Sequence, residues 1–302
     1  MKRTKNKVNL FLDSGAYSAL TQGVSIDIQE YIQFVKEHED VLEIYANLDV
    51  IGDAEGTWKN QMIMEEAGLN PLPVFHYGED IKWLKKYLER GHEYISLGGL
   101  VGGSNSALVS WLDPIWGEHL TDAEGMPLVK VHGFGLTSLR LMLRYPWYSV
   151  DSTSWVVTGR LGSIYVPRYR QGQWIYDEDS WKVAVSNQSP SNKEAGKHIN
   201  TLRKKEREII LDYIHDKGYV LGRSEFKVVS DTHTLNENEK WAQKKKTVKG
   251  GKRLLEIIHE PGISNQYKLR DEMNILYFLD LEDSMQKWPW AFKKLNPKKS
   301  LF

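Results

Sequence analysis

The sequence has no cysteine among its 302 residues. A chain without thiols forms no disulfides and offers no cysteine nucleophile, iron–sulfur cluster or cysteine-ligated zinc site. Long apolar runs are missing too. The first, Val8–Leu12, is too short for the core of a signal peptide, and no run approaches the roughly 18 residues of a transmembrane helix. We therefore expect a cytoplasmic protein without membrane spans and without a cofactor.

Positive and negative charges balance overall but not along the chain. The 40 basic residues match 40 acidic ones. Up to Tyr165, however, there are 14 basic and 21 acidic residues, and from Val166 onward there are 26 and 19. An asymmetry of this kind often indicates a partner for the basic half of a protein.

The basic surplus is concentrated in Ser191–Arg253, with 16 basic and 9 acidic residues. We call its densest part the basic cluster; it consists of Lys244, Lys245, Lys246, Lys249, Lys252 and Arg253. Cations beside glycine suit contacts with a phosphate backbone, because glycine lets the main chain approach closely. A solvated loop without a partner is the alternative interpretation.

Short apolar runs alternate with longer amphipathic stretches through the first half of the chain. The runs predict strands at Val8–Leu12, Leu42–Val50, Pro73–His76, Tyr94–Leu97, Leu128–Val131 and Trp147–Val150. The stretches between them predict helices at Ile26–Glu39, Thr57–Ala67, Ile81–Leu88, Ser106–Ile115 and Ser138–Arg144. Strands that alternate with helices predict parallel β/α units.

These units predict an α/β fold, namely a TIM-like (β/α)8 barrel formed by residues 1–302 as a single domain. The last two strands are expected in the second half, where the candidates are Ser163–Val166, Phe226–Val229 and Asn274–Leu279. Residues 186–253 are expected to be a basic insertion of loops around one helix, Asn200–His215. The absence of cysteine predicts that there is no zinc subdomain.

Polar residues collect where the predicted strands end: Asp13, Asp49, His76, Gly98, Gly99 and Asp151. In a β/α barrel these C-terminal ends carry the chemistry. A single Asp after a strand is commonly a turn former or helix cap, but several at one edge can share a reaction. One carboxylate then serves as a nucleophile, and another with a raised pKa serves as acid or base, as in cleavage of a glycosidic bond.

Six short motifs resemble those of the tRNA-guanine transglycosylases, in the same order and at similar spacing. Together they span about residues 8–160 of the chain. The motifs are Asp13-Ser14-Gly15-Ala16-Tyr17-Ser18, Asn47-Leu48-Asp49, Phe75-His76-Tyr77-Gly78, Leu97-Gly98-Gly99-Leu100, His132-Gly133-Phe134-Gly135 and Ser149-Val150-Asp151.

The chain departs from the tRNA enzymes in three ways. His76 stands where they have glutamine, Ala16 replaces the second glycine of the first motif, and their zinc site of three cysteines and a histidine cannot exist here. These departures and the short chain look more like the viral and bacterial branch that places 7-deazaguanines in DNA. The resemblance therefore favours DNA as the partner, with a tRNA-guanine transglycosylase as the alternative and a 7-deazaguanine base as co-substrate in either case.

The resemblance also implies roles for the matched residues. Asp151 would be the nucleophile that attacks C1′ of the nucleotide, and Asp13 would protonate the departing guanine and deprotonate the incoming base. The base would be bound by Ser14, Tyr17, Asp49, His76, Gly98, Gly99 and Leu100. Asp49 would read the N1–H and 2-amino edge, and the basic cluster would bind the nucleic acid. His132 is interpreted as a packing residue.

Two other classes of protein remain open. A barrel glycoside hydrolase would use the same carboxylates on a sugar and would account for 11 tryptophans, but not for the order of the motifs. A non-catalytic nucleic-acid-binding protein could share the fold, although intact Asp13 and Asp151 argue against it. The sequence leaves the 7-substituent of the incoming base and the oligomeric state open.

Overall fold

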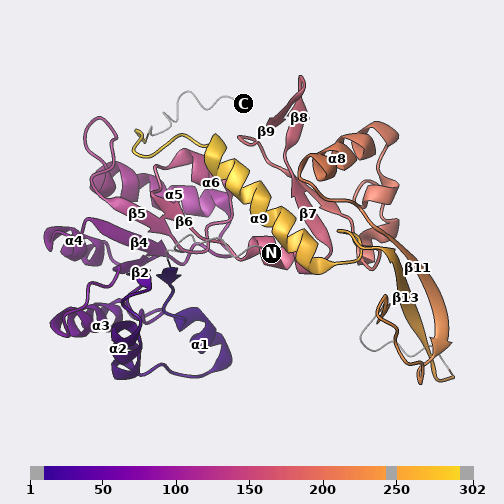
Figure 1. Ribbon diagram of the computed structural model, residues 1–302. Coiled ribbons are helices and arrows are strands. Elements are labelled where there is room, and N and C mark those ends of the chain that lie inside the picture. The colour runs from indigo at the N-terminus through magenta and orange to yellow at the C-terminus, as the bar shows by residue number, and fades with distance from the viewer. Residues whose placement is uncertain (1–9, 243–249, 293–302) are drawn as a thin grey trace. The chain divides into compact units, whose positions relative to one another are not determined.

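The computed structural model describes residues 10–242 and 250–292. The chain divides into two compact units (Figure 1). The first unit comprises residues 1–152 and 286–302, and the second comprises residues 153–285. The prediction of one domain for residues 1–302 stays a prediction.

The first unit is built from six parallel strands joined by helices. The strands are β1 (Leu10–Leu12), β2 (Leu42–Tyr45), β3 (Val74–His76), β4 (Tyr94–Gly98), β5 (Lys130–Gly133) and β6 (Ser149–Val150). β1 pairs with β2, and β3 to β6 form a four-stranded sheet. A parallel bridge between Ala46 and Leu72 links the two sets, so neighbours in sequence are neighbours in space.

The helices of the first unit occupy the intervals between the strands. They are α1 (Ala16–Gln22), α2 (Ile28–Glu37), α3 (Ala54–Glu66), α4 (Lys82–Glu89), α5 (Asn105–Ile115) and α6 (Leu139–Arg144), with a π-helix over Trp116–Leu120. The predicted alternation of strands and helices is therefore confirmed. Most of the predicted boundaries lie within a few residues of the observed ones. Asp27 caps α2, because its side chain accepts hydrogen bonds from the backbone N–H groups of Gln29 and Glu30.

Apolar faces of the helices fix the strands in place. Tyr31 and Val35 of α2 and Met64 of α3 pack with Tyr45 of β2 in one buried cluster. The sheet is also curved, because the ring of Phe11 on β1 lies 4.6 Å, between centroids, from that of His132 on β5. Parallel β/α units are thus present in the first unit, whereas closure into a barrel stays a prediction.

The second unit is mainly antiparallel. Its elements are α7 (Ser154–Arg160), β7 (Ser163–Val166), β8 (Arg168–Arg170), β9 (Gln173–Ile175), β10 (Trp181–Ala184), α8 (Lys204–Asp216), β11 (Arg223–Ser230), β12 (Glu239–Trp241), β13 (Lys252–Glu260) and α9 (Tyr267–Ser284). Short 3-10 turns lie at Pro190–Lys193 and Ile199–Thr201. β11 and β13 extend together away from α8 as a long ribbon (Figure 1).

The three candidates for the last two barrel strands differ in the secondary structure that they form. Ser163–Val166 is β7, but it pairs antiparallel with β10. Phe226–Val229 lies within β11, which pairs antiparallel with β13. The prediction of a strand at Asn274–Leu279 is wrong, because these residues belong to α9. A continuous apolar run has no period that separates strand from helix, and here Met273, Tyr277 and Leu281 recur at helical spacing on the buried face.

The basic insertion expected at residues 186–253 contains the predicted helix as α8, together with strand residues from β11, β12 and the start of β13. The region therefore contains more strand than expected, since only Phe226–Val229 was a strand candidate within it and much of the ribbon lies there. In the part of the chain that the structure describes, none of the helices is sufficiently long and apolar to cross a bilayer.

Candidate active site

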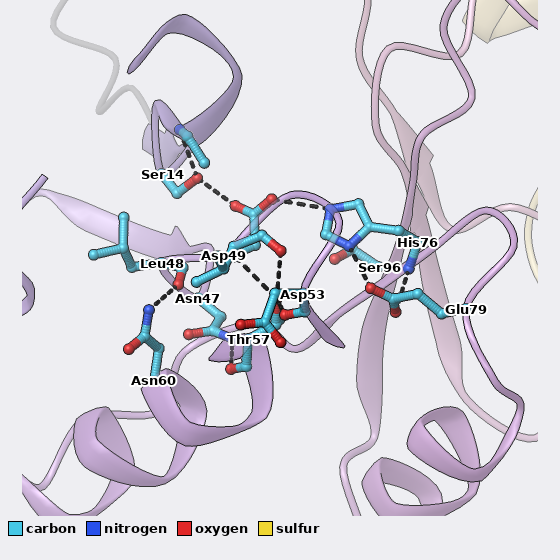
Figure 2. Close-up of polar contacts among 12 residues, drawn as sticks. Ser14, Asn47, Leu48, Asp49, Asp53, Thr57, Asn60, His76, Glu79 and Ser96 are labelled. Carbon is cyan, nitrogen blue, oxygen red and sulfur yellow. Dashed lines mark hydrogen bonds and ion pairs between the residues drawn. The ribbon is translucent and has the colours of Figure 1, made fainter. Parts of the chain in front are cut away.

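The C-terminal ends of β1, β2 and β3 bring three predicted site residues into direct contact (Figure 2). The hydroxyl of Ser14 donates to Oδ1 of Asp49 at 2.6 Å. Nε2 of His76 lies 2.9 Å from Oδ2 of the same carboxylate. Ser14 is buried, and the side chains of Asp49 and His76 are only 11% and 12% exposed. Residues far apart in sequence thus form one polar network.

Helix α3 holds the segment that carries Asp49. Nδ2 of Asn60 donates to the Leu48 carbonyl at 2.7 Å, and the amide of Val50 donates to Oγ1 of Thr57 at 2.9 Å. These side chains form hydrogen bonds with backbone groups that would otherwise pair with a neighbouring strand. β2 therefore ends at Tyr45, although the apolar run predicted a strand as far as Val50.

His76 lies between two carboxylates. Its Nδ1 is 3.1 Å from Oε1 of Glu79, whose Oε2 accepts a hydrogen bond from the His76 amide at 2.9 Å. Burial lowers the pKa of His76, but the contacts with Asp49 and Glu79 outweigh burial and raise the pKa to about 9. The imidazole is therefore protonated at neutral pH and donates from both ring nitrogens.

Gly98 ends β4 and Gly99 follows it, and the local packing around each position favours glycine. A Cβ atom at Gly98 would lie 2.6 Å from Cδ2 of His76, so only glycine leaves room for the imidazole. Gly99 has a φ of 73° and faces Tyr77 closely. Leu100 is buried. The resemblance implied that both glycines bind a base; in the structure Gly98 lies against His76, the last residue of β3, and Gly99 lies against Tyr77, which follows it.

Asp13 and Asp151 have oppositely shifted pKa values. Burial raises the pKa of Asp13, and the negative charges of Asp49 and Asp151 raise it further, against the backbone amides of Ser14 and Gly15. Its side chain still meets solvent, so these charges are partly screened. The shared electrostatic interaction indicates that the strand ends carry one site rather than several.

The Asp151 carboxylate is held from one side. The amide of Gly135 donates to its Oδ1 at 2.7 Å, and Nε2 of His132 lies 3.4 Å from the same oxygen. Burial raises the pKa of Asp151, but the imidazole of His132 and the amide of Gly135 outweigh burial and lower it. The side chain is 51% exposed. Asp151 is thus an ionised carboxylate that a substrate can reach.

The structure adds four residues to the site that sequence reasoning missed or interpreted as packing: Glu79, Tyr94, His132 and Ser149. Nδ1 of His132 is 2.6 Å from the hydroxyl of Ser149, which is 2.6 Å from the hydroxyl of Tyr94. Two sequence signals were available. Glu79 follows His76 by three residues across a Gly turn, and Ser149 precedes Asp151 by two, the spacing of one strand face.

Other predicted site residues are not brought into these contacts. Tyr17 on α1 is 66% exposed, so it is not a core residue. In the basic cluster, residues 244–249 lie outside the described residues. Lys252 and Arg253 begin β13 in the second unit, where the guanidinium of Arg253 lies 4.1 Å from the Trp241 ring centroid.

No group of three or more His, Asp or Glu side chains is arranged to hold a metal ion among residues 10–242 and 250–292. The comparisons with known proteins add no family to this description: no family model, curated protein or solved structure matches the chain. The geometry of the strand ends is therefore the basis for inferring a function. It supplies an accessible ionised carboxylate, a second carboxyl with a raised pKa, and a buried network of polar groups.

Proposed function

We propose that this chain is a base-exchange transglycosylase of the tRNA-guanine transglycosylase superfamily, which replaces guanine in DNA by a 7-deazaguanine. The observation that supports this most is the pair Asp13 and Asp151, two coupled carboxyl groups whose pKa values are shifted in opposite directions. Covalent cleavage of a glycosidic bond needs this division, because one group must be an anion and the other a proton donor.

In the proposed reaction, a carboxylate oxygen of Asp151 attacks C1′ of the target nucleotide. The bond from C1′ to N9 breaks, and its electron pair leaves with guanine, which takes the proton of Asp13. The products are a glycosyl ester on Asp151, free guanine and an ionised Asp13. The incoming 7-deazaguanine then gives its N9 proton to Asp13, and N9 attacks C1′ to release Asp151.

Base recognition is proposed for Asp49. Its oxygens already accept from Ser14 and His76, but a carboxylate has about four acceptor positions. The remaining ones suit the N1–H and 2-amino groups of guanine, which are donors. Both ring nitrogens of His76 face carboxylates, so we assign His76 the task of holding Asp49 in place and not the direct contact with the base that the resemblance implied.

The nucleic-acid part of the proposal rests on charge and on two features of the sequence. A guanine must leave the duplex stack to reach a site at the strand ends, or be single-stranded already. The basic surplus from Val166 onward would bind the phosphate backbone. Ala16 in the first motif and the absence of cysteine favour DNA over tRNA as the substrate.

The test is nucleoside mass spectrometry of DNA and tRNA from cells that express the chain and are supplied with 7-deazaguanine precursors. A modified deoxynucleoside is expected with the parent and not with Asp151→Asn. Asp40→Asn, an exposed Asp of the first unit, serves as the matched control and should modify DNA as the parent does. A modified ribonucleoside in tRNA alone would overturn the DNA assignment, and activity only on oligosaccharides would overturn the reaction class.

A further inference from the structure

Tyr94, Ser149 and His132 form a chain of polar contacts that ends at the proposed nucleophile. The three consecutive separations are 2.6 Å from the Tyr94 hydroxyl to that of Ser149, 2.6 Å from Ser149 to Nδ1 of His132, and 3.4 Å from Nε2 of His132 to Oδ1 of Asp151. Parallel pairing of β5 with β6 puts His132 directly opposite Ser149. The register of the sheet therefore builds this chain.

The imidazole of His132 has little freedom to turn. It is 2% exposed. Its ring centroid lies 4.6 Å from that of Phe11, with an angle of 30° between the ring planes. It lies 4.6 Å from that of Phe134, with an interplanar angle of 77°. Phe11 comes from β1 and Phe134 follows β5. Aromatic rings on two sides and a hydroxyl at Nδ1 fix the direction of Nε2.

The contacts also decide which ring nitrogen of His132 carries the proton. If the proton were only on Nδ1, the lone pair of Nε2 would face the Asp151 carboxylate, which is repulsive. The Ser149 hydroxyl can donate to Nδ1, so the arrangement favours a proton on Nε2. Nε2 is buried and has no hydrogen-bond partner of good geometry among the described residues. Asp151 is the acidic group that it faces.

From this geometry we infer that His132, held by Ser149, is a positioning residue that fixes Oδ1 of Asp151 and presents Oδ2 to the substrate. The inference rests on the proposed function. Both the Gly135 amide and Nε2 of His132 face Oδ1, whereas no other side chain in the described part of the chain hydrogen-bonds to Oδ2. A carboxylate held through one oxygen attacks with the other and loses less orientation freedom at that step.

The charges around Asp151 make the inference measurable by pH. The negative charges of Asp49 and Asp151 oppose ionisation of Asp13, whereas the His132 imidazole and the Gly135 amide favour ionisation of Asp151. Removing the imidazole should raise the pKa of Asp151. Exchange requires ionised Asp151, so the acidic limb of the pH profile should move to higher pH, by about one pH unit.

The experiment compares His132→Leu, His132→Gln and Ser149→Ala with the parent. The Leu variant should lower kcat about 100-fold with little change in KM for the free base, because Asp49 and Ser14 are untouched. Gln has an N–H that can reach Asp151 and should restore part of kcat. Ser149→Ala should lower kcat less, and should shift the acidic limb of the pH profile less, than His132→Leu does. His92→Leu is the matched control, since His92 is a largely buried histidine 3.2 Å from Glu65, and the pH profile of this variant should not move.

A second readout separates this inference from the proposed function. Carbon-13 NMR of carboxyl-labelled aspartates, with Asp151 assigned from Asp151→Asn, follows the titration of Asp151 without any substrate. An upward shift in His132→Leu supports the inference even if the parent exchanges no guanine. An unchanged Asp151 titration overturns it even if the parent is an active transglycosylase. Equal losses of kcat and thermal stability in all three variants, without rescue by Gln, would also overturn it, because His132 would then be a packing residue.

Discussion

Nε2 of His76 lies 2.9 Å from Oδ2 of Asp49, so the ends of β3 and β2 meet in a charge-assisted hydrogen bond. Glu79 holds the other side of the imidazole. A cation between two carboxylates, with little exposure to solvent, is a rigid element of the proposed base site.

Asp151→Asn is expected to abolish exchange of labelled guanine and leave the fold intact. The amide oxygen can still accept the Gly135 N–H, so local structure should survive, but an amide does not form the glycosyl ester. Loss of a covalent nucleophile costs several orders of magnitude in kcat. Circular dichroism checks folding and a filter-binding exchange assay checks activity. Retention of more than about a tenth of the activity would show that Asp151 is not the nucleophile.

Asp13→Asn is expected to stabilise the protein at neutral pH while it removes activity. The raised pKa of Asp13 means that ionisation is less favourable in the folded state. The parent therefore loses stability as pH rises through the folded pKa of Asp13, and the Asn variant does not. Because Asp13 meets solvent, the gain in Tm at pH 7 should be on the order of a degree or two.

The measurement is the difference in Tm between Asp13→Asn and the parent from pH 4 to pH 8. The difference should grow as pH rises and shrink toward zero near the unfolded-state pKa of about 3.9. A variant less stable than the parent at pH 7 would mean that the Asp13 carboxylate is stabilising. The backbone amides of Ser14 and Gly15 would then dominate over the neighbouring charges.

Affinity for the free 7-deazaguanine base should fall as pH rises through the pKa of His76, about 9. The raised pKa means that the contacts of the imidazolium are complete below about pH 6.5 and are lost as the proton leaves. One of the two carboxylates then has no donor, and Asp49 is no longer held on both sides. Calorimetric titration between pH 7 and pH 10 measures the change.

His76→Gln supplies the control for that titration. Glutamine does not titrate in this range, whereas ionisation of the base itself is common to both proteins. The affinity of His76→Gln should therefore change only with ionisation of the base. It should lack the further decrease that deprotonation of His76 causes in the parent. Identical pH curves for the variant and the parent would show that the His76 charge has no influence on base binding.

Gly98→Ala should displace the His76 ring and weaken base binding. The added Cβ would lie 2.6 Å from Cδ2 of His76, with Cγ1 of Val74 at 3.4 Å. Overpacking of this kind costs about 1–3 kcal/mol. In a His76→Ala background the same change should cost much less, because the clashing ring is gone. Urea unfolding of the four proteins measures the coupling, and additive effects would contradict the predicted clash.

Neutralising all six cations of the basic cluster should weaken DNA binding without altering affinity for the free base. Each lost phosphate contact should reduce the log–log salt slope by roughly 0.7–0.9. The measurement is a salt titration of binding to DNA and to tRNA, with free-base affinity as the internal control. An unchanged slope would mean that the cluster touches no phosphate, and a preference for tRNA would reverse the choice of substrate.

The first half of the fold could be predicted from the sequence because its strands and helices have clear periods and end signals. Asp27 caps α2, and Gly68 and Gly91 end α3 and α4 with positive φ. The second half could not be predicted as well. Asn274 lies in an apolar run without a period, and it is buried only because Tyr165, Trp155 and Ser163 satisfy its amide from distant segments.

The sequence by itself determined that Asp13, Asp49, His76 and Asp151 stand at strand ends, since an acid after an apolar run is a local feature. Tertiary structure alone decided which of them touch and how their pKa values shift. Those shifts depend on burial and on charges from other strands, which no local pattern contains. His132 shows the difference most directly: its neighbours Phe11, Ser149 and Asp151 reach it only because parallel pairing and curvature of the sheet bring them together.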